Sequence, residues 1–451
     1  MADWPMAGAN AQRTSYQAAE SLGATWSVSW GYRFSSGLSP AELIYPGLDP
    51  IVASGHVLVP TLMGKLRAFQ TGLAAAGGGT IQWTATVGAP IVCTPAADTT
   101  NVYVADAYGR LSAWRLTDGV NVWGPVQITN GTPFRGAVLL ADSKLLLGGA
   151  DGTFYAVNPT TGAVLWSTAL GGMKPILGGA AWSAASGVNT VYVAAEDMRV
   201  RAFNSGTGAL IATSAVLPGS TFSLFWPVIK ESSNMLVIRA QPQYPALGFS
   251  YAGAPPYRGI EADVSVAGQQ DSVLAAYDAT PSNYATNLHL LNLTTLATLP
   301  STMHWHYVYG HGSLPAPCLD RNGYMIIPFK VPPSVAVGQY AQFARVDLAT
   351  RKVVDYLWDG TPLSQDNAPD ENEFASACAT GIWALHCQET NAAKSGFWRQ
   401  PANAWISTPA GPPDNQMFYN HQGPSAGPGV ISGGMGYHLA QYHRLLAWRT
   451  L

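Results

Sequence analysis

Charged residues are scarce in this chain. Only 11% of its 451 residues are Asp, Glu, Lys or Arg, the formal net charge is −3, and the basic residues are scattered. A nucleic-acid-binding surface needs clustered Lys and Arg, so we expect no nucleic-acid partner. No apolar run is long enough to span a bilayer, so the sequence predicts no transmembrane segment.

Cysteine is also rare, and its spacing excludes the familiar cysteine motifs. Cys93, Cys318, Cys378 and Cys387 include no CxxC pair, no CxxCH haem-attachment sequence and no adjacent pair. We therefore expect single buried thiols rather than a disulfide framework.

Glycine, proline and tryptophan are abundant, and tryptophan falls in a repeated phrase. The chain has 47 Gly, 32 Pro and 15 Trp, which suits many turns between close-packed strands. In the phrase, a Gly follows an Ala by six residues and a Trp follows the Gly by four. The copies are Ala113, Gly119 and Trp123, then Ala156, Gly162 and Trp166, then Ala202 and Gly208 with Ala212 in the last place. A repeat of this size indicates stacked or radial units.

Each unit reads as a short antiparallel meander. Asp-Gly and Thr-Gly pairs separate short alternating runs, and such pairs are hairpin signals. Eight units align on their third strand, at Leu66, Leu111, Phe154, Val200, Leu288, Phe343, Phe397 and Leu445. A period of about 45 residues with four strands is typical of propeller blades. The sequence predicts an all-β fold, one eight-bladed β-propeller domain of four-stranded antiparallel blades over residues 1–451.

Two further features concern how the ring is assembled. The last unit ends after its third strand, whereas residues 24–30 resemble a fourth strand with no strands before it. We expect these residues to complete the C-terminal blade, which closes the ring and removes two sheet edges. The wide spacing before Leu288 indicates an insertion in blade 5, over residues 241–270.

The opening DWPMAGANAQRTSY and the Gly-x-x-x-Trp phrases resemble the PQQ-like, or quinoprotein-type, eight-bladed propellers. That superfamily includes quinoprotein alcohol dehydrogenases and the outer-membrane assembly scaffold BamB. In the family the repeated tryptophan docks against the neighbouring blade. The resemblance implies this structural role for Trp83, Trp123, Trp166, Trp358 and Trp405. Relatives are usually exported, so the resemblance also implies a periplasmic, extracellular or cell-surface location, although the given sequence shows no signal peptide.

The resemblance does not extend to the quinoprotein active site. The dehydrogenases hold PQQ against a vicinal disulfide, with Ca²⁺ ligands and a catalytic Asp, and this chain has no Cys-Cys pair. We therefore expect no PQQ, while Ca²⁺ or another divalent metal stays open.

The connections between blades become long and polar in the second half of the chain. The first contains His304, His306 and His311 beside Trp305, Tyr307 and Tyr309. Alternate residues of an extended segment share a side, so two of these histidines could bind a metal or transfer a proton, with Tyr307 as a further catalytic candidate. The alternative is a polar rim whose histidines bond to the backbone.

Two other connections add candidate residues to the same face. Asp366, Asp370 and Glu371 could hold Ca²⁺ with their oxygens or form a solvated loop. The remaining candidates for a binding face are Tyr32, Arg33, Arg135, Tyr419, Asn420 and His421. Lys174, on a short connection of the first half, could add positive charge as Arg135 could.

Two classes of function follow. The first is a non-catalytic exported or cell-surface scaffold that binds proteins or surface glycans and self-assembles into oligomers. The second is an enzyme of the central face, either a polysaccharide lyase or hydrolase with a His and Tyr acid-base pair, or a quinoprotein-type oxidoreductase. The missing quinoprotein residues favour the scaffold.

Overall fold

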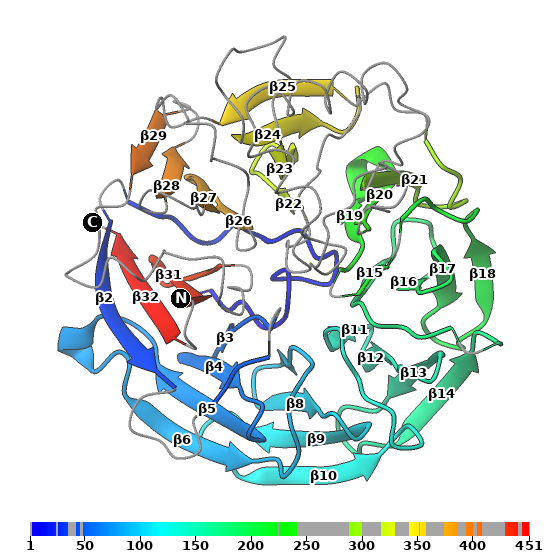
Figure 1. Cartoon of the computed structure of the whole chain (residues 1–451), viewed down its shortest axis with the longest axis horizontal. Helices are drawn as coiled ribbons and strands as arrows, with labels where there is room; N and C mark the ends of the chain where they lie inside the picture. Colours follow the sequence, from blue (N-terminus) through cyan, green and yellow to red (C-terminus); the bar gives the residue numbers. More distant parts are fainter. Residues whose placement is uncertain are drawn as a thin grey trace, which may run out of the picture.

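The computed structural model of the chain is a ring of β-sheets (Figure 1). The structure describes residues 2–23, 26–34, 42–45, 48–172, 174–219, 221–223, 225–240, 288–299, 317–329, 342–350, 352–357, 374–386, 394–399, 404–407, 429–440 and 444–450. The strands of these segments form eight sheets, and the helical content is two 3₁₀ turns, η1 (Ala74–Ala76) and η2 (Glu231–Ser233). The all-β class and the eight-bladed propeller are confirmed.

The first four blades have four antiparallel strands each, in sequence order from the centre outwards. Blade 1 is β3 (Ile51–Ala53), β4 (His56–Pro60), β5 (Lys65–Gln70) and β6 (Ile81–Thr86); blade 2 is β7 (Ala96–Ala97), β8 (Asn101–Ala105), β9 (Arg110–Arg115) and β10 (Asn121–Gln127). Blade 3 is β11 (Leu139–Ala141), β12 (Lys144–Gly148), β13 (Thr153–Val157) and β14 (Val164–Ala169); blade 4 is β15 (Ala180–Ser183), β16 (Thr190–Ala195), β17 (Arg199–Asn204) and β18 (Leu210–Thr213).

The second half of the ring is less regular. Blade 5 shows β19 (Val228–Lys230), β20 (Met235–Arg239) and β21 (Leu288–Asn292); blade 6 is β22 (Cys318–Leu319), β23 (Met325–Phe329), β24 (Gln342–Asp347) and β25 (Lys352–Leu357). Blade 7 is β26 (Phe374–Cys378), β27 (Gly381–His386), β28 (Lys394–Arg399) and β29 (Ala404–Ser407), with β1 (Tyr16–Gln17) added in parallel to β26. All eight aligned residues lie on the third strand of a blade, as predicted. The insertion at 241–270 lies outside the described residues.

Blade 8 is closed by the N-terminal part of the chain, as the sequence predicts. It contains β30 (Val430–Ser432), β31 (Met435–Ala440), β32 (Arg444–Thr450) and, as its outer strand, β2 (Trp26–Arg33). The prediction placed this strand at 24–30, but its pairing with β32 continues to Arg33 opposite Arg444. The closing strand is therefore longer at its C-terminal end than predicted, because β32 offers partners along its whole length.

The repeated phrase corresponds to one packing arrangement. Ala113 lies opposite Trp123 on the adjacent strand, and Ala156 lies opposite Trp166. The small alanine leaves room for the tryptophan, whose ring contacts the turn glycine of the next blade. A Cβ on Gly162 would come within 2.7 Å of the Trp123 ring, so this glycine is required for close approach as well as for its φ of +74°.

The N-terminal arm, defined as residues 2–22, crosses the centre of the ring (Figure 1). Its carbonyl groups accept main-chain hydrogen bonds of 2.8–3.0 Å from the first strands of six blades. The donors are Val52, Ala97, Trp182, Ile229, Leu319 and Ala377, and the acceptors are Trp4, Pro5, Ala11, Gln12, Thr14 and Ser15 in the same order. The two remaining blades are reached through side chains, by Arg13 to Val138 and by Ser432 to Ala2. The arm therefore bonds to all eight blades.

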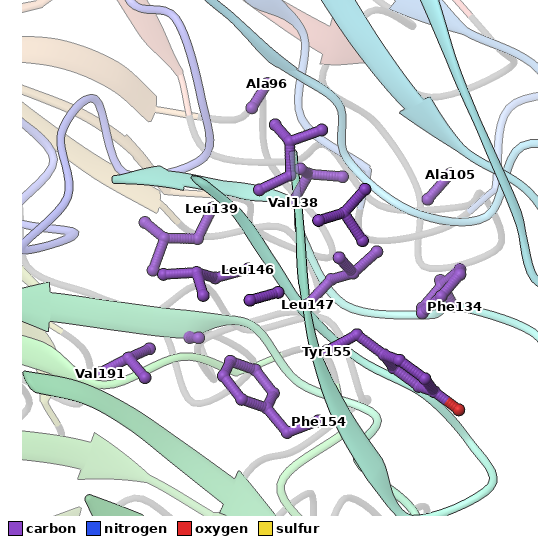
Figure 2. Packing of buried hydrophobic residues seen from close by; sticks show 14 of the residues in the cluster. Ala96, Ala105, Phe134, Val138, Leu139, Leu146, Leu147, Phe154, Tyr155 and Val191 are labelled. Atoms are coloured by element: carbon purple, nitrogen blue, oxygen red, sulfur yellow. The ribbon is translucent and has the colours of Figure 1, made fainter. Parts of the chain in front are cut away.

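Apolar packing between blades completes the core. One cluster joins blades 2, 3 and 4, with Leu146 and Phe154 at its centre and Val191 on the next blade (Figure 2). Phe154 stacks on Phe203 of blade 4 with ring centroids 5.9 Å apart. The second strands of blades 2–4, β8, β12 and β16, are buried almost throughout, because these sheets pack against neighbouring blades.

Candidate functional site

Most of the predicted site residues lie outside the described residues. These are His304, Trp305, His306, Tyr307, Tyr309, His311, Trp358, Asp366, Asp370, Glu371, Tyr419, Asn420 and His421, and the side chain of Trp405 is outside as well. The metal and acid-base hypotheses that depend on them stay predictions. Within the described part of the chain, no three His, Cys, Asp or Glu side chains come together to hold a metal ion.

The structure places Tyr32 and Arg33 at the end of β2. The Tyr32 ring packs edge-on against Phe34 and tilted against Phe69, with centroids 4.9 Å away in both cases. These contacts make Tyr32 part of the junction between blades 8 and 1. Arg33 is exposed next to it.

The two predicted cations of the first half also make contacts within the protein. Arg135 is exposed and donates a hydrogen bond of 3.3 Å from Nη1 to the Tyr45 hydroxyl. Lys174 forms an ion pair of 3.3 Å with Asp197, which Arg201 also binds through its guanidinium. The pKa of Asp197 is lowered because hydrogen bonds and charge from Arg201 and Lys174 outweigh its partial burial.

Arg13 and Asp49 are both buried and influence each other's pKa through their charges. The Arg13 guanidinium donates to the carbonyl oxygens of Ala180 at 2.8 Å, Val138 at 3.1 Å and Ala7 at 2.5 Å. Burial lowers its pKa to about 10, opposed by the charge of Asp49. Burial raises the Asp49 pKa well above its usual value, and neither of its oxygens has a hydrogen-bond partner among the described residues.

Three of the cysteines are described, Cys93, Cys318 and Cys378, and all are free and buried as expected. Burial raises the pKa of the Cys93 thiol to about 12, so it stays protonated. These thiols pack in the core of the blades.

The outer strands of blades 1–4 carry exposed aliphatic side chains at one place in the repeat, just before the tryptophan position. We define the outer rim as these residues: Ile81, Val120, Val122, Val164, Leu165, Leu210 and Ile211, which are 38–55% exposed. They lie on, or immediately before, β6, β10, β14 and β18. The same chemistry thus recurs on four consecutive blades.

The main chain of these four strands is also open on one side. Each is the last strand of its sheet, and no described strand pairs with its outer edge. None of the four contains Lys, Arg, Asp or Glu. By contrast, the outer strand of blade 6, β25, carries Lys352 and Asp355. Charged residues on an edge are a common protection against pairing with other chains, and blades 1–4 lack this protection.

Sequence reasoning missed the outer rim because exposed and buried strand aliphatics look alike in one sequence. The signal was present as the two residues before each tryptophan position, such as Val164 and Leu165 before Trp166. Adjacent residues of a strand point to opposite faces. In a strand buried on one face, only one of two neighbouring aliphatics would be covered.

The fold and the repeat define the class of protein, an eight-bladed β-propeller with tryptophans on its outer strands. The resemblance to PQQ-like propellers is confirmed: the family described as outer membrane protein assembly factor BamB matches residues 70–222, from the end of β5 to beyond β18. No curated protein sequence matches the chain.

Solved structures share the fold at low identity. The chain is similar to a europium-containing methanol dehydrogenase, with a TM-score of 0.58, 11% identity and coverage of 97% of this chain and 89% of that one. For the quinohemoprotein alcohol dehydrogenase from Comamonas testosteroni, the TM-score is 0.57 and the identity 11%, and the match covers 99% of this chain and 80% of that one. For the computationally designed Ika8 protein, the TM-score is 0.57 and the identity 10%, and the match covers 95% of this chain and 100% of that one. These identities show the fold alone. No helix of the described residues is long and apolar enough to cross a membrane.

Proposed function

We propose that this protein is a non-catalytic scaffold that binds other proteins along the outer rim of blades 1–4. The observation that carries the proposal is the recurrence of exposed aliphatic side chains on four consecutive uncharged outer strands. Exposed apolar surface of this extent is unfavourable in water and marks interaction sites. Each of these strands also offers unpaired main-chain groups to an extended partner segment.

The chemistry of the outer rim favours a protein partner over a glycan. Leu165, Leu210 and Ile211 are aliphatic and provide neither a flat aromatic face nor polar groups for sugar hydroxyls. A strand edge, in contrast, matches the main chain of any polypeptide. The name of the matching family, an outer membrane assembly factor, supports a role in protein contacts and an exported location, and both are part of the proposal.

Site-specific photo-cross-linking in the cells that make the protein tests this function. A photoreactive amino acid at Leu165 should give cross-links to other proteins. The matched control is the same amino acid at Val188, an exposed aliphatic residue that precedes β16 and lies away from the outer strands. Equal cross-linking at the two positions would overturn the proposal, as would cross-links at neither.

A further inference from the structure

We propose that the outer rim binds a second copy of this chain, through antiparallel pairing of an outer strand with the same strand of the other copy. This inference rests on the proposed function, because it names the partner of the same surface. Four blades carry such an edge, so one molecule can bind several others. The association is then open-ended rather than limited to a dimer.

The main chain of the outer strands determines the form of the partner. β14 is six residues long, contains no proline and leaves one row of N–H and C=O groups without a strand beside it in the described part of the chain. Only another extended segment satisfies that row in register. A twofold axis through the edge of β14 places one β14 antiparallel to another, which is the symmetry of a self-complementary contact.

The side chains then determine which extended segment fits. Because β6, β10, β14 and β18 contain no charged residue, an identical strand meets no like charge when it pairs. Pairing over the whole of β14 would place Val164 opposite Ala169 and Leu165 opposite Thr168 of the other copy, and would cover part of an aliphatic surface that is otherwise 44–47% exposed. A second copy therefore matches the outer rim in hydrogen bonding and in the absence of charge.

The size of each contact predicts weak binding at each edge. One short strand buries far less than the roughly 1,200–2,000 Å² of a stable interface. A single edge should therefore bind weakly, and assembly should depend on how many edges one molecule carries. This dependence on the number of edges distinguishes strand pairing from nonspecific hydrophobic association.

The test uses the full-length protein and variants that place one lysine on each edge. The substitutions, all at exposed positions, are Ile81→Lys, Val122→Lys, Leu165→Lys and Leu210→Lys. A control variant adds four lysines at exposed aliphatic residues outside the outer strands, Met63→Lys, Leu73→Lys, Val188→Lys and Val216→Lys. Sedimentation velocity is measured from about 1 to about 200 μM, where contacts of this size are expected to bind.

For the wild type and the control, we expect the mass of the sedimenting species to increase with protein concentration to more than twice the 47.6 kDa of the monomer. A variant with one edge intact should stop at a dimer, and a variant with none should stay monomeric. Unchanged melting temperatures would show that the variants are folded, since the substituted side chains are exposed. A monomeric wild type, or a control variant that loses association, overturns the inference. A monomeric wild type that still cross-links to other proteins at Leu165 would leave the proposed function standing.

Discussion

The indole nitrogen of Trp30 donates a hydrogen bond of 2.8 Å to the carbonyl oxygen of Gly72, across the junction between blade 8 and blade 1. The Trp30 ring lies so close to Gly79 that a Cβ there would be 2.7 Å from ring atoms. Trp83, by the same geometry, bonds to Leu116 in blade 2 at 2.7 Å. The ring is therefore closed by the contact that also joins its interior blades.

Replacing Trp30 by Ala should remove this closing contact. We expect a loss of roughly 3–5 kcal/mol in the free energy of unfolding, which is typical for deleting a large buried aromatic side chain. Trp30→Phe keeps most of the packing against Phe69 and loses the hydrogen bond, so it should cost about 1 kcal/mol. Urea denaturation of both variants gives the comparison. An unchanged midpoint for Trp30→Ala would show that the closing contact contributes nothing.

The junction between blades 4 and 5 lacks both the tryptophan and the glycine of this contact. Between blades 4 and 5, Ala212 stands where the outer strands of blades 1–3 have tryptophan. The turn position that is glycine in blades 2–4 is Leu296, which has a φ of +56° and is fully buried. Ala212 packs against the apolar cluster that contains Leu296. A large and a small residue have thus exchanged places across the junction.

This exchange predicts strong coupling between the two positions. Ala212→Trp alone should overpack the junction, and Leu296→Gly alone should leave a cavity, each costing more than about 1 kcal/mol. The double variant restores the tryptophan and glycine of the other junctions and removes a positive φ at a leucine. It should therefore lose less stability than the sum of the losses of the two single variants. A double-mutant cycle from urea denaturation measures the coupling. Additive effects would contradict the size exchange.

The propeller could be predicted from sequence because its information is local and repeated. Gly119 and Gly162 at fixed distances before Trp123 and Trp166 identify the turn between third and fourth strands. Eight copies of one unit also determine the closure, since the last unit lacks a strand. The alignment therefore identified third strands even in the degenerate second half, where Phe343 and Phe397 keep only the strand pattern.

The N-terminal arm was not predicted from sequence, for a physical reason. Its contacts to six blades are made by main-chain carbonyls, which every residue type has. Its buried large apolar side chains are few, Trp4, Met6 and Leu22, and the buried Arg13 reads in the sequence as a surface residue. The outer rim was missed because exposed and buried strand aliphatics look alike in one sequence.

Arg13 is expected to be the strongest single anchor of the arm. Arg13→Met keeps part of the apolar volume but leaves the carbonyls of Ala180 and Val138 without their donor and removes the charge that faces Asp49. We expect a loss of roughly 3–5 kcal/mol in the free energy of unfolding, because several buried carbonyl groups lose their hydrogen-bond donor at once. If Asp49 is part of the cost, Arg13→Met with Asp49→Asn will lose less than Arg13→Met alone. Equal losses would show that the carbonyls carry the whole effect.

Asp49 also predicts a pH dependence with a definite sign. Burial raises its pKa in the folded protein above the unfolded value, with Arg13 opposing the shift. The folded state then binds the proton more tightly, so the contribution to stability is present below the unfolded pKa and is lost as the pH rises through the folded pKa. Asp49→Asn should therefore gain stability relative to the wild type as the pH rises from about 4 to 7. Parallel stability curves for the two proteins would contradict this assignment.

His438 predicts the opposite sign, in the blade that closes the ring. It is fully buried between Trp383 and Trp448, and the Trp448 indole donates to its Nδ1 at 3.1 Å. Burial lowers its pKa to about 3. The unfolded chain takes up this proton from about pH 6.5 downwards and the folded protein does not, so stability falls as the pH drops from 6.5 towards 3.

The test for His438 is the variant His438→Asn, whose side-chain oxygen can accept the Trp448 hydrogen bond but does not titrate. The free energy of unfolding of the wild type should decline more steeply with acid than that of the variant, by up to about 1.4 kcal/mol per pH unit. His289, whose pKa burial lowers to about 4, remains in both proteins and cancels in the comparison. A constant difference between pH 6.5 and 4 would show that His438 takes up its proton equally in both states. A difference that shrinks with acid would show that His438 takes up its proton only in the unfolded chain, so that acid destabilises the blade that β2 and β32 close together.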